Sequence, residues 1–173
     1  MRRRGALVFA GVGLAAAAAG IGAAAWRKRQ QASAADDSLW SQRFERPEGG
    51  ELTLGAFRQQ PLLLNFWATW CPPCVSELPL LDRFHRARSG SGWQVIGLAV
   101  DKLVPVRDFL RQHPIGFPVG LAGLDGIELA RQLGNGGGAL PFTAVFDRSG
   151  KIVRRKLGVI EPADLQEWEK AVG

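Results

Sequence analysis

The chain has 173 residues, 46% of them hydrophobic, which fits one globular domain. Its formal charge of +6 comes from the first 31 residues, where six Lys and Arg side chains occur without an acid. The remaining 16 basic residues equal the 16 acidic ones, so we expect no nucleic-acid partner. The one internal basic run, Arg154–Lys156, alternates faces on a predicted strand and is expected to be a solvated edge.

Residues 1–26 are predicted to be a membrane anchor or an export signal. Within them, Ala6–Ala25 carries no charge and is long enough, as a helix, to span about 30 Å of hydrocarbon. The basic triplet Arg2–Arg4 precedes this run, and small residues that suit a cleavage site follow it. We favour a retained anchor, with the domain outside the cytoplasm, over a removed signal peptide or a helix buried in a soluble protein. Residues 27–38 are predicted to be a linker, and residues 39–173 the folded domain.

The first half of the domain is predicted to form a hairpin and then a parallel unit of strand, helix and strand. Phe44–Arg46 and Glu51–Phe57 flank turn residues, as in a hairpin. The apolar run Pro61–Trp67 predicts a strand buried on both faces. Pro72–Arg88 has the apolar spacing of a helix, and Trp93–Val100 predicts a second buried strand.

The second half adds further helices and a second hairpin, which complete a predicted α/β fold. A mixed central sheet with helices on both faces is the arrangement that this order of elements favours. Its predicted elements are two helices (Val104–Gln112 and Asp125–Leu133), a short strand between them (Phe117–Leu121), two hairpin strands (Thr143–Asp147 and Lys151–Gly158), and a last helix that starts at Pro162 and buries Leu165, Trp168 and Val172.

The two cysteines, Cys71 and Cys74, stand where the first buried strand meets its helix. Unpaired N–H groups and the positive end of the helix dipole favour a thiolate at Cys71, which becomes the nucleophile. Cys74, one turn later, can attack a mixed disulfide on Cys71 and release the product. Because Pro72 and Pro73 have no N–H to stabilise the thiolate, we expect a reducing couple, nearer the roughly −270 mV of thioredoxin than the roughly −120 mV of a strong oxidant.

Two motifs, Trp67–Cys74 (WATWCPPC) and Leu140–Thr143 (LPFT), resemble those of the membrane-tethered thioredoxin-like proteins of the TlpA/ResA type. The similarity covers about residues 44–172. It implies a thioredoxin fold and a thiol–disulfide oxidoreductase, held at a bacterial inner membrane, that works in the periplasm with a redox-active disulfide and no further cofactor. It also implies protein substrates such as apocytochromes, in cytochrome c maturation, and a membrane protein as electron donor.

The resemblance further implies the substrate-binding residues. In this family the Leu140–Pro141 bond is cis, faces the cysteines and pairs through its backbone with the bound peptide, whereas the base rate for cis X–Pro bonds is only about 5–6%. Trp70 and Pro72, on either side of Cys71, complete the predicted binding surface. The alternative for Trp70 is that it packs inside the domain. Trp67 is expected to lie in the core.

Glu77 is the candidate partner for proton exchange with Cys74. Asn65 takes the place where cytoplasmic thioredoxins have a buried Asp, so that base is missing. Glu77 follows Cys74 by three residues and therefore shares its side of the helix. ResA-type proteins have a glutamate at this position beside the cysteines. The alternative is a solvent-facing Glu77 that is stabilised only by the helix dipole.

Three other classes of function remain open. A zinc or copper site needs about four ligands, and only His85 and His113 are left to supply them. A peroxidase of the same fold would reduce peroxide through a sulfenic acid, whereas the adjacent resolving thiol favours disulfide exchange. A purely structural interaction domain would give the motif no role. We therefore expect no metal site. We also expect a monomeric protein.

Overall fold

The computed structural model describes Trp26 and residues 38–172. The predicted span Ala6–Ala25, and the linker up to residue 37, lie outside the described residues. Among the residues that are described, no helix is both long enough and apolar enough to cross a membrane. The chain divides into two compact units, Met1–Leu39 and Trp40–Gly173, and the second unit contains all the elements below.

A mixed sheet of seven strands forms the centre of this unit, as predicted, in the order β2-β1-β5-β4-β3-β6-β7. The neighbours β3, β4 and β5 are parallel, whereas β6 is antiparallel to both β3 and β7. The strands are β1 (Arg43–Glu45), β2 (Glu51–Thr53), β3 (Leu62–Trp67), β4 (Gln94–Ala99), β5 (Val119–Leu121), β6 (Phe142–Phe146) and β7 (Ile152–Leu157).

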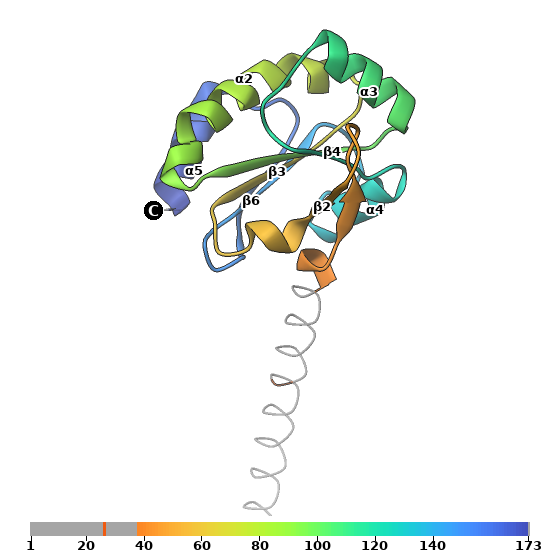
Figure 1. Ribbon diagram of the computed structural model, residues 1–173. Helices are drawn as coiled ribbons and strands as arrows, with labels where there is room; N and C mark the ends of the chain where they lie inside the picture. Colours follow the sequence, from red (N-terminus) through yellow and green to blue (C-terminus); the bar gives the residue numbers. More distant parts are fainter. Residues whose placement is uncertain (1–25, 27–37, 173) are drawn as a thin grey trace, which may run out of the picture. The chain divides into compact units, whose positions relative to one another are not determined.

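Helices cover both faces of the sheet, which confirms the predicted layering (Figure 1). On one face lie α2 (Pro72–Arg88), α3 (Leu103–Gln112) and α5 (Pro162–Val172). On the other lie α4 (Asp125–Gln132) and the short 3-10 helix η1 (Leu54–Phe57), while η2 (Ser89–Ser91) follows α2.

The strand β3 is buried along its whole length, as its continuous apolar run predicted. Its residues alternate between the two faces, and Leu63 and Trp67 join the cluster that α2 and α5 cover. The Trp67 indole lies directly over Gly97 of β4, where an added Cβ would come within 2.9 Å of the indole nitrogen. Gly97 therefore makes room for the tryptophan that ends β3, and the prediction that Trp67 belongs to the core is confirmed.

Two predicted strands are shorter in the structure. The strand predicted over Glu51–Phe57 ends at Thr53, and the chain turns into η1. Leu54, fully buried, starts this turn, and Gly55 fits closely against the Trp40 carbonyl, which a Cβ would approach to 2.9 Å. In the strand predicted over Phe117–Leu121, pairing starts only at Val119, because Pro118 has no N–H to donate to a neighbouring strand.

The basic run on β7 is held by partners within the domain. Arg154 pairs with Glu167, and Lys156 pairs with Asp164, both on α5. The Arg155 guanidinium donates to the Leu133 carbonyl at 2.6 Å. These contacts agree with the expectation that the run is an edge of the domain and not a phosphate-binding patch.

Replacement of Leu81 with Ala should lower the free energy of unfolding by about 2–5 kcal/mol, because it opens a cavity beneath α2 where the side chain is fully buried. Leu124, which is 80% exposed, is the matched control, and Leu124→Ala should change stability by about 0.5 kcal/mol or less. Urea unfolding of the disulfide-bonded protein measures both values. Equal effects of the two substitutions would show that the core has been assigned wrongly.

Candidate functional site

The two cysteines form a disulfide at the N-terminus of α2. Cys71 is the residue that caps the helix, and Pro72 and Pro73 occupy the first two helical positions, where no N–H is needed for helical bonding. Cys74 lies one turn further, with the two Cα atoms 5.3 Å apart. Cys71 is 6% exposed, whereas Cys74 is completely buried. Of the two cysteines, therefore, Cys71 is the more accessible.

One backbone N–H donates a hydrogen bond to the Cys71 sulfur. The Cys74 N–H points to Cys71 Sγ at 3.3 Å. This is the donor that the sequence left available, since neither proline has an N–H to offer. A thiolate at Cys71 would thus have this N–H and the positive end of a 17-residue helix to stabilise it.

The loop that leads from β3 to Cys71 is fastened to the loop that follows β4. Both the N–H and the hydroxyl of Thr69 donate to Asp101 Oδ2, at 3.0 and 2.5 Å. Within the loop, the Cys71 N–H donates to the Ala68 carbonyl at 3.2 Å. Trp70, between these anchors, is 62% exposed, so the alternative that it packs inside the domain is wrong.

The Leu140–Pro141 peptide bond is cis, as the resemblance predicted. It precedes β6, whose first residue, Phe142, pairs with Phe66 of β3. Because β3 ends one residue later and leads to Cys71, the cis bond and the disulfide lie at the same end of two neighbouring strands. The Pro141 carbonyl accepts from the Gly158 N–H, but within the described part of the chain the backbone N–H and carbonyl of Leu140 make no hydrogen bond.

Glu77 is buried, with 1% of its surface exposed, so the alternative that it faces solvent is wrong. Its Oε1 accepts from the Asn65 amide at 2.7 Å, and its Oε2 accepts from the Ile160 N–H at 2.7 Å. The same Asn65 nitrogen donates to the Thr143 hydroxyl at 3.0 Å. A carboxyl group on α2 is therefore tied to β3, to β6 and to the loop before α5.

Burial raises the pKa of Glu77 above the ordinary value of 4.5, because the charged form loses water. The hydrogen bonds from Ile160 and Asn65 and the charge of Lys156 act in the opposite direction and are weaker together than burial. A carboxyl with a raised pKa, one helical turn from Cys74, is a candidate for proton exchange with that thiol.

The histidines do not join this site. His113 is exposed and stacks on Phe109, with ring centroids 4.6 Å apart. His85 is half-buried and meets Phe117 edge to face. In the part of the chain that the structure describes, no group of three or more His, Cys, Asp or Glu side chains could hold a metal ion.

The match to a known family covers most of the domain. Residues 34–172 fit the family model described as Redoxin. The chain belongs to the Redoxin family. This redoxin is also similar to the thiol-disulfide oxidoreductase ResA of Bacillus thuringiensis subsp. konkukian, with 29% identity over 126 residues, which are 72% of this chain and 70% of that one. The disulfide at the helix terminus and these relatives together make the protein a thiol–disulfide oxidoreductase.

Solved structures confirm the predicted thioredoxin fold. A thiol:disulfide interchange protein of the thioredoxin family from Chlorobium tepidum superposes with a TM-score of 0.66 and 28% identity, over 77% of this chain and 94% of that one. A secreted Mycobacterium tuberculosis disulfide oxidoreductase, described as homologous to E. coli DsbE, shares the fold with a TM-score of 0.63 and 20% identity, over 78% of this chain and 98% of that one.

Three partners in the site were not predicted from the sequence. They are the Thr143 hydroxyl and the Ile160 N–H, which complete the Glu77 network, and Asp101, which holds the loop before Cys71. The signal for the first was Asn65 itself, since a polar side chain inside a fully buried strand requires polar neighbours. No comparable signal marks Ile160 or Asp101.

Replacement of Glu77 with Gln should change how stability depends on pH. Since the folded state raises the pKa of Glu77, it binds this proton more tightly than the unfolded chain does. The contribution of the Glu77 carboxyl to the free energy of unfolding is thus most favourable below pH 4.5. It declines as pH rises, until Glu77 is ionised in the folded protein. The stability of Glu77→Gln relative to the wild type should therefore increase across that pH range.

Urea unfolding of the oxidised protein from about pH 3.5 to 8 measures this trend. Glu128→Gln, at an exposed position on α4, is the matched control and should follow the wild type at every pH. A constant stability difference between Glu77→Gln and the wild type would contradict the raised pKa.

Proposed function

We propose that this redoxin reduces protein disulfides outside the cytoplasm, with Cys71 as the attacking and Cys74 as the resolving thiol. The observation that carries the proposal is the asymmetry of the disulfide. Cys71 caps α2 and keeps 6% of its surface exposed, whereas Cys74, one turn later, is fully buried. A more accessible nucleophile next to an enclosed second thiol is an arrangement that suits thiol–disulfide exchange.

The reaction consists of two exchanges. In the reduced protein, the Cys71 thiolate attacks one sulfur of the substrate disulfide, a bond forms between the two sulfurs, and the substrate's other sulfur leaves as a thiolate. The Cys74 thiolate then attacks Cys71 Sγ, which releases the second substrate thiol and leaves the disulfide found in the structure. Two electrons from a membrane donor protein return the pair to the dithiol.

The substrate binds along the cis-proline segment. The free N–H and carbonyl of Leu140 can pair with the backbone of an extended peptide, and Pro141 lies at the same end of the sheet as the disulfide. Trp70 and Pro72, which flank Cys71 in the sequence, are both exposed and add apolar contact. The two prolines of the motif also favour the reducing direction, because they leave the thiolate few donors.

The proposed location is the periplasmic side of a bacterial inner membrane, and residues 1–26 are the proposed anchor. We propose that the domain works as a monomer. The uncharged run Ala6–Ala25, flanked by basic residues, supports this. The secreted oxidoreductase of the same fold also supports export. Exported proteins with cysteine pairs, apocytochromes among them, are the proposed substrates.

Replacement of Cys74 with Ser should trap the substrate. Without the resolving thiol, the mixed disulfide on Cys71 cannot be released and should accumulate in cells that express the full chain. Non-reducing electrophoresis followed by mass spectrometry would identify the trapped proteins, and Cys71→Ser is the control that should trap nothing. If Cys74→Ser traps no thiol protein, disulfide reduction is not the function.

We further propose that Glu77 accepts the proton of Cys74 during the second exchange. Glu77→Gln should then slow release of the product on the order of 10²-fold at neutral pH and shift the low-pH limb of the rate profile to higher pH, since a general base has been removed. Rapid-quench measurement of mixed-disulfide decay between about pH 5 and 9 would show this, with Glu128→Gln as control. An unchanged profile would leave Glu77 with a structural role alone.

A further inference from the structure

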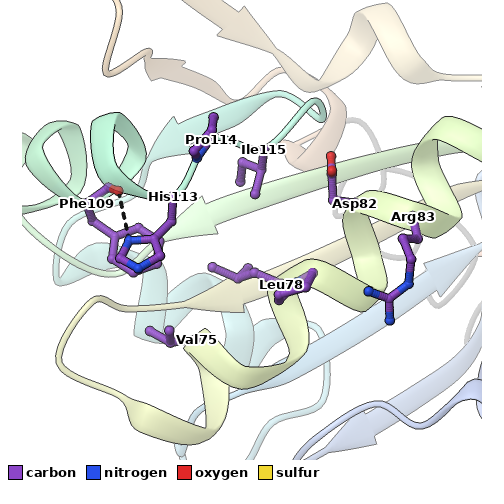
Figure 2. A pocket seen from close by; sticks show the side chains of 9 residues that line it. Val75, Leu78, Asp82, Arg83, Phe109, His113, Pro114 and Ile115 are labelled. Carbon is purple, nitrogen blue, oxygen red and sulfur yellow. Dashed lines mark hydrogen bonds between the residues drawn. The ribbon is translucent and has the colours of Figure 1, made fainter.

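A cavity of about 410 Å³ lies between α2 and the C-terminal end of α3, outside the proposed site (Figure 2). Its floor is apolar and includes Val75, Leu78, Phe109 and Ile115. The volume is within the range of about 300–1,000 Å³ that is usual for ligand pockets. Neither the disulfide nor the Glu77 network uses these side chains.

The cavity is built before any ligand arrives. The Asp82 carboxylate of α2 accepts the Gly116 N–H at 2.5 Å and so fixes the segment after α3 against α2. At the opposite end, the stacked rings of Phe109 and His113 close the wall near Val75 (Figure 2). These two contacts hold the walls of the cavity in place, and neither of them needs a bound molecule.

The cavity lies on the same side of α2 as the attacking cysteine. Val75, Leu78 and Asp82 follow Cys71 by four, seven and eleven residues, so they share its side of α2. At a rise of 1.5 Å per residue, Leu78 lies about 11 Å along the helix from Cys71. An extended polypeptide advances about 3.3 Å per residue, so a chain bonded to Cys71 reaches the cavity with its third residue or so.

The charges at the far end favour an acidic partner. Asp82 is neutralised by Arg86, whose Nε donates to it at 2.8 Å. Arg83, which lines the same end of the cavity, makes no hydrogen bond or ion pair with any of the described residues. The cavity therefore offers one unpaired positive charge, about 18 Å along α2 from Cys71.

Pro79 adds a possible backbone contact. It lies within α2 on the lining of the cavity, and it has no N–H to donate to the Val75 carbonyl, four residues earlier. That carbonyl is left without its helical partner, at the end of the cavity nearest the disulfide. It can accept an N–H from a chain that lies along α2.

We propose that this cavity selects the polypeptide that exchanges disulfides with Cys71. It takes an apolar side chain about three residues from the partner's cysteine, and Arg83 takes an acidic side chain about two residues further on. The inference rests on the proposed function and gives it a substrate class, namely cysteine segments of the pattern Cys, apolar, acidic at this spacing.

The test uses peptides whose single cysteine carries a mixed disulfide with 2-mercaptoethanol. In the first set, Phe stands three residues and Glu five residues from the cysteine. One peptide of this set has both residues on the N-terminal side of the cysteine, and another has both on the C-terminal side. Matched peptides replace either Phe with Ser or Glu with Lys. The full chain, reduced beforehand, gives one turnover, in which its dithiol is oxidised and the peptide disulfide is reduced to two thiols. The Phe/Glu peptide should react about tenfold faster than the Ser/Glu peptide and a few-fold faster than the Phe/Lys peptide.

Two variants and their matched controls connect these preferences to the cavity. Ile115→Trp should fill the cavity and remove the preference for Phe, while Val104→Trp, at a position that is 55% exposed and outside the cavity, should keep it. Arg83→Glu should reverse the preference for Glu over Lys, while Arg148→Glu, in the exposed turn between β6 and β7, should not. All four variants should reduce bis(2-hydroxyethyl) disulfide at the wild-type rate, which also shows that they are folded.

The outcomes separate this inference from the proposed function. Equal rates for all peptides in the wild type, or a Phe preference that survives Ile115→Trp, would overturn the inference while leaving disulfide reduction intact. A wild-type dimer in sedimentation that Ile115→Trp dissociates would also overturn it, because the occupant would be a second copy of this chain. No reduction of any peptide or of the small disulfide would contradict the proposed function itself.

Discussion

The complete burial of β3 is the constraint on which the site depends. This strand has a neighbour on each side and is covered on both faces, so its end is fixed in space. Cys71 follows that end by four residues, over a loop that Asp101 holds. The same strand places Asn65 beneath α2, where its amide holds the Glu77 carboxylate. The positions of Cys71 and of the buried Glu77 carboxyl thus both depend on one strand.

The buried polar network around Glu77 combines an unfavourable burial with hydrogen bonds that partly offset it. A carboxylate without water is unfavourable unless donors surround it. Asn65 and Ile160 supply two such donors, yet burial still prevails and the pKa of Glu77 rises. Asn65 Oδ1 also remains buried without a hydrogen-bond partner among the described residues. A buried carboxyl with a raised pKa and an unpaired amide oxygen beside it are the kind of strained polar group that is often found at functional sites.

Much of the fold follows from local patterns in the sequence. The uninterrupted apolar run of β3, the helical spacing after the cysteines and the turn residues between β6 and β7 each led to the observed element. The strand predicted over Glu51–Phe57 was too long, because its end is determined by tertiary contacts. The chain turns into η1 there, and Gly55 lies close against the Trp40 carbonyl. In the site, the cysteines and Pro141 could be recognised from motifs. The donors to Glu77 could not, because Ile160 contributes only its backbone N–H, which no residue type reveals.

The three cations on β7 have a consequence for how molecules of this protein meet one another. β7 is an edge strand, with β6 on one side only, and its free side would otherwise invite a strand from another chain. Positive side chains on an edge strand oppose such pairing, and Arg154 and Arg155 are both exposed there. The opposite edge, β2, is only three residues long. Both edges of the sheet thus discourage the addition of a strand from another molecule, which guards the domain against aggregation.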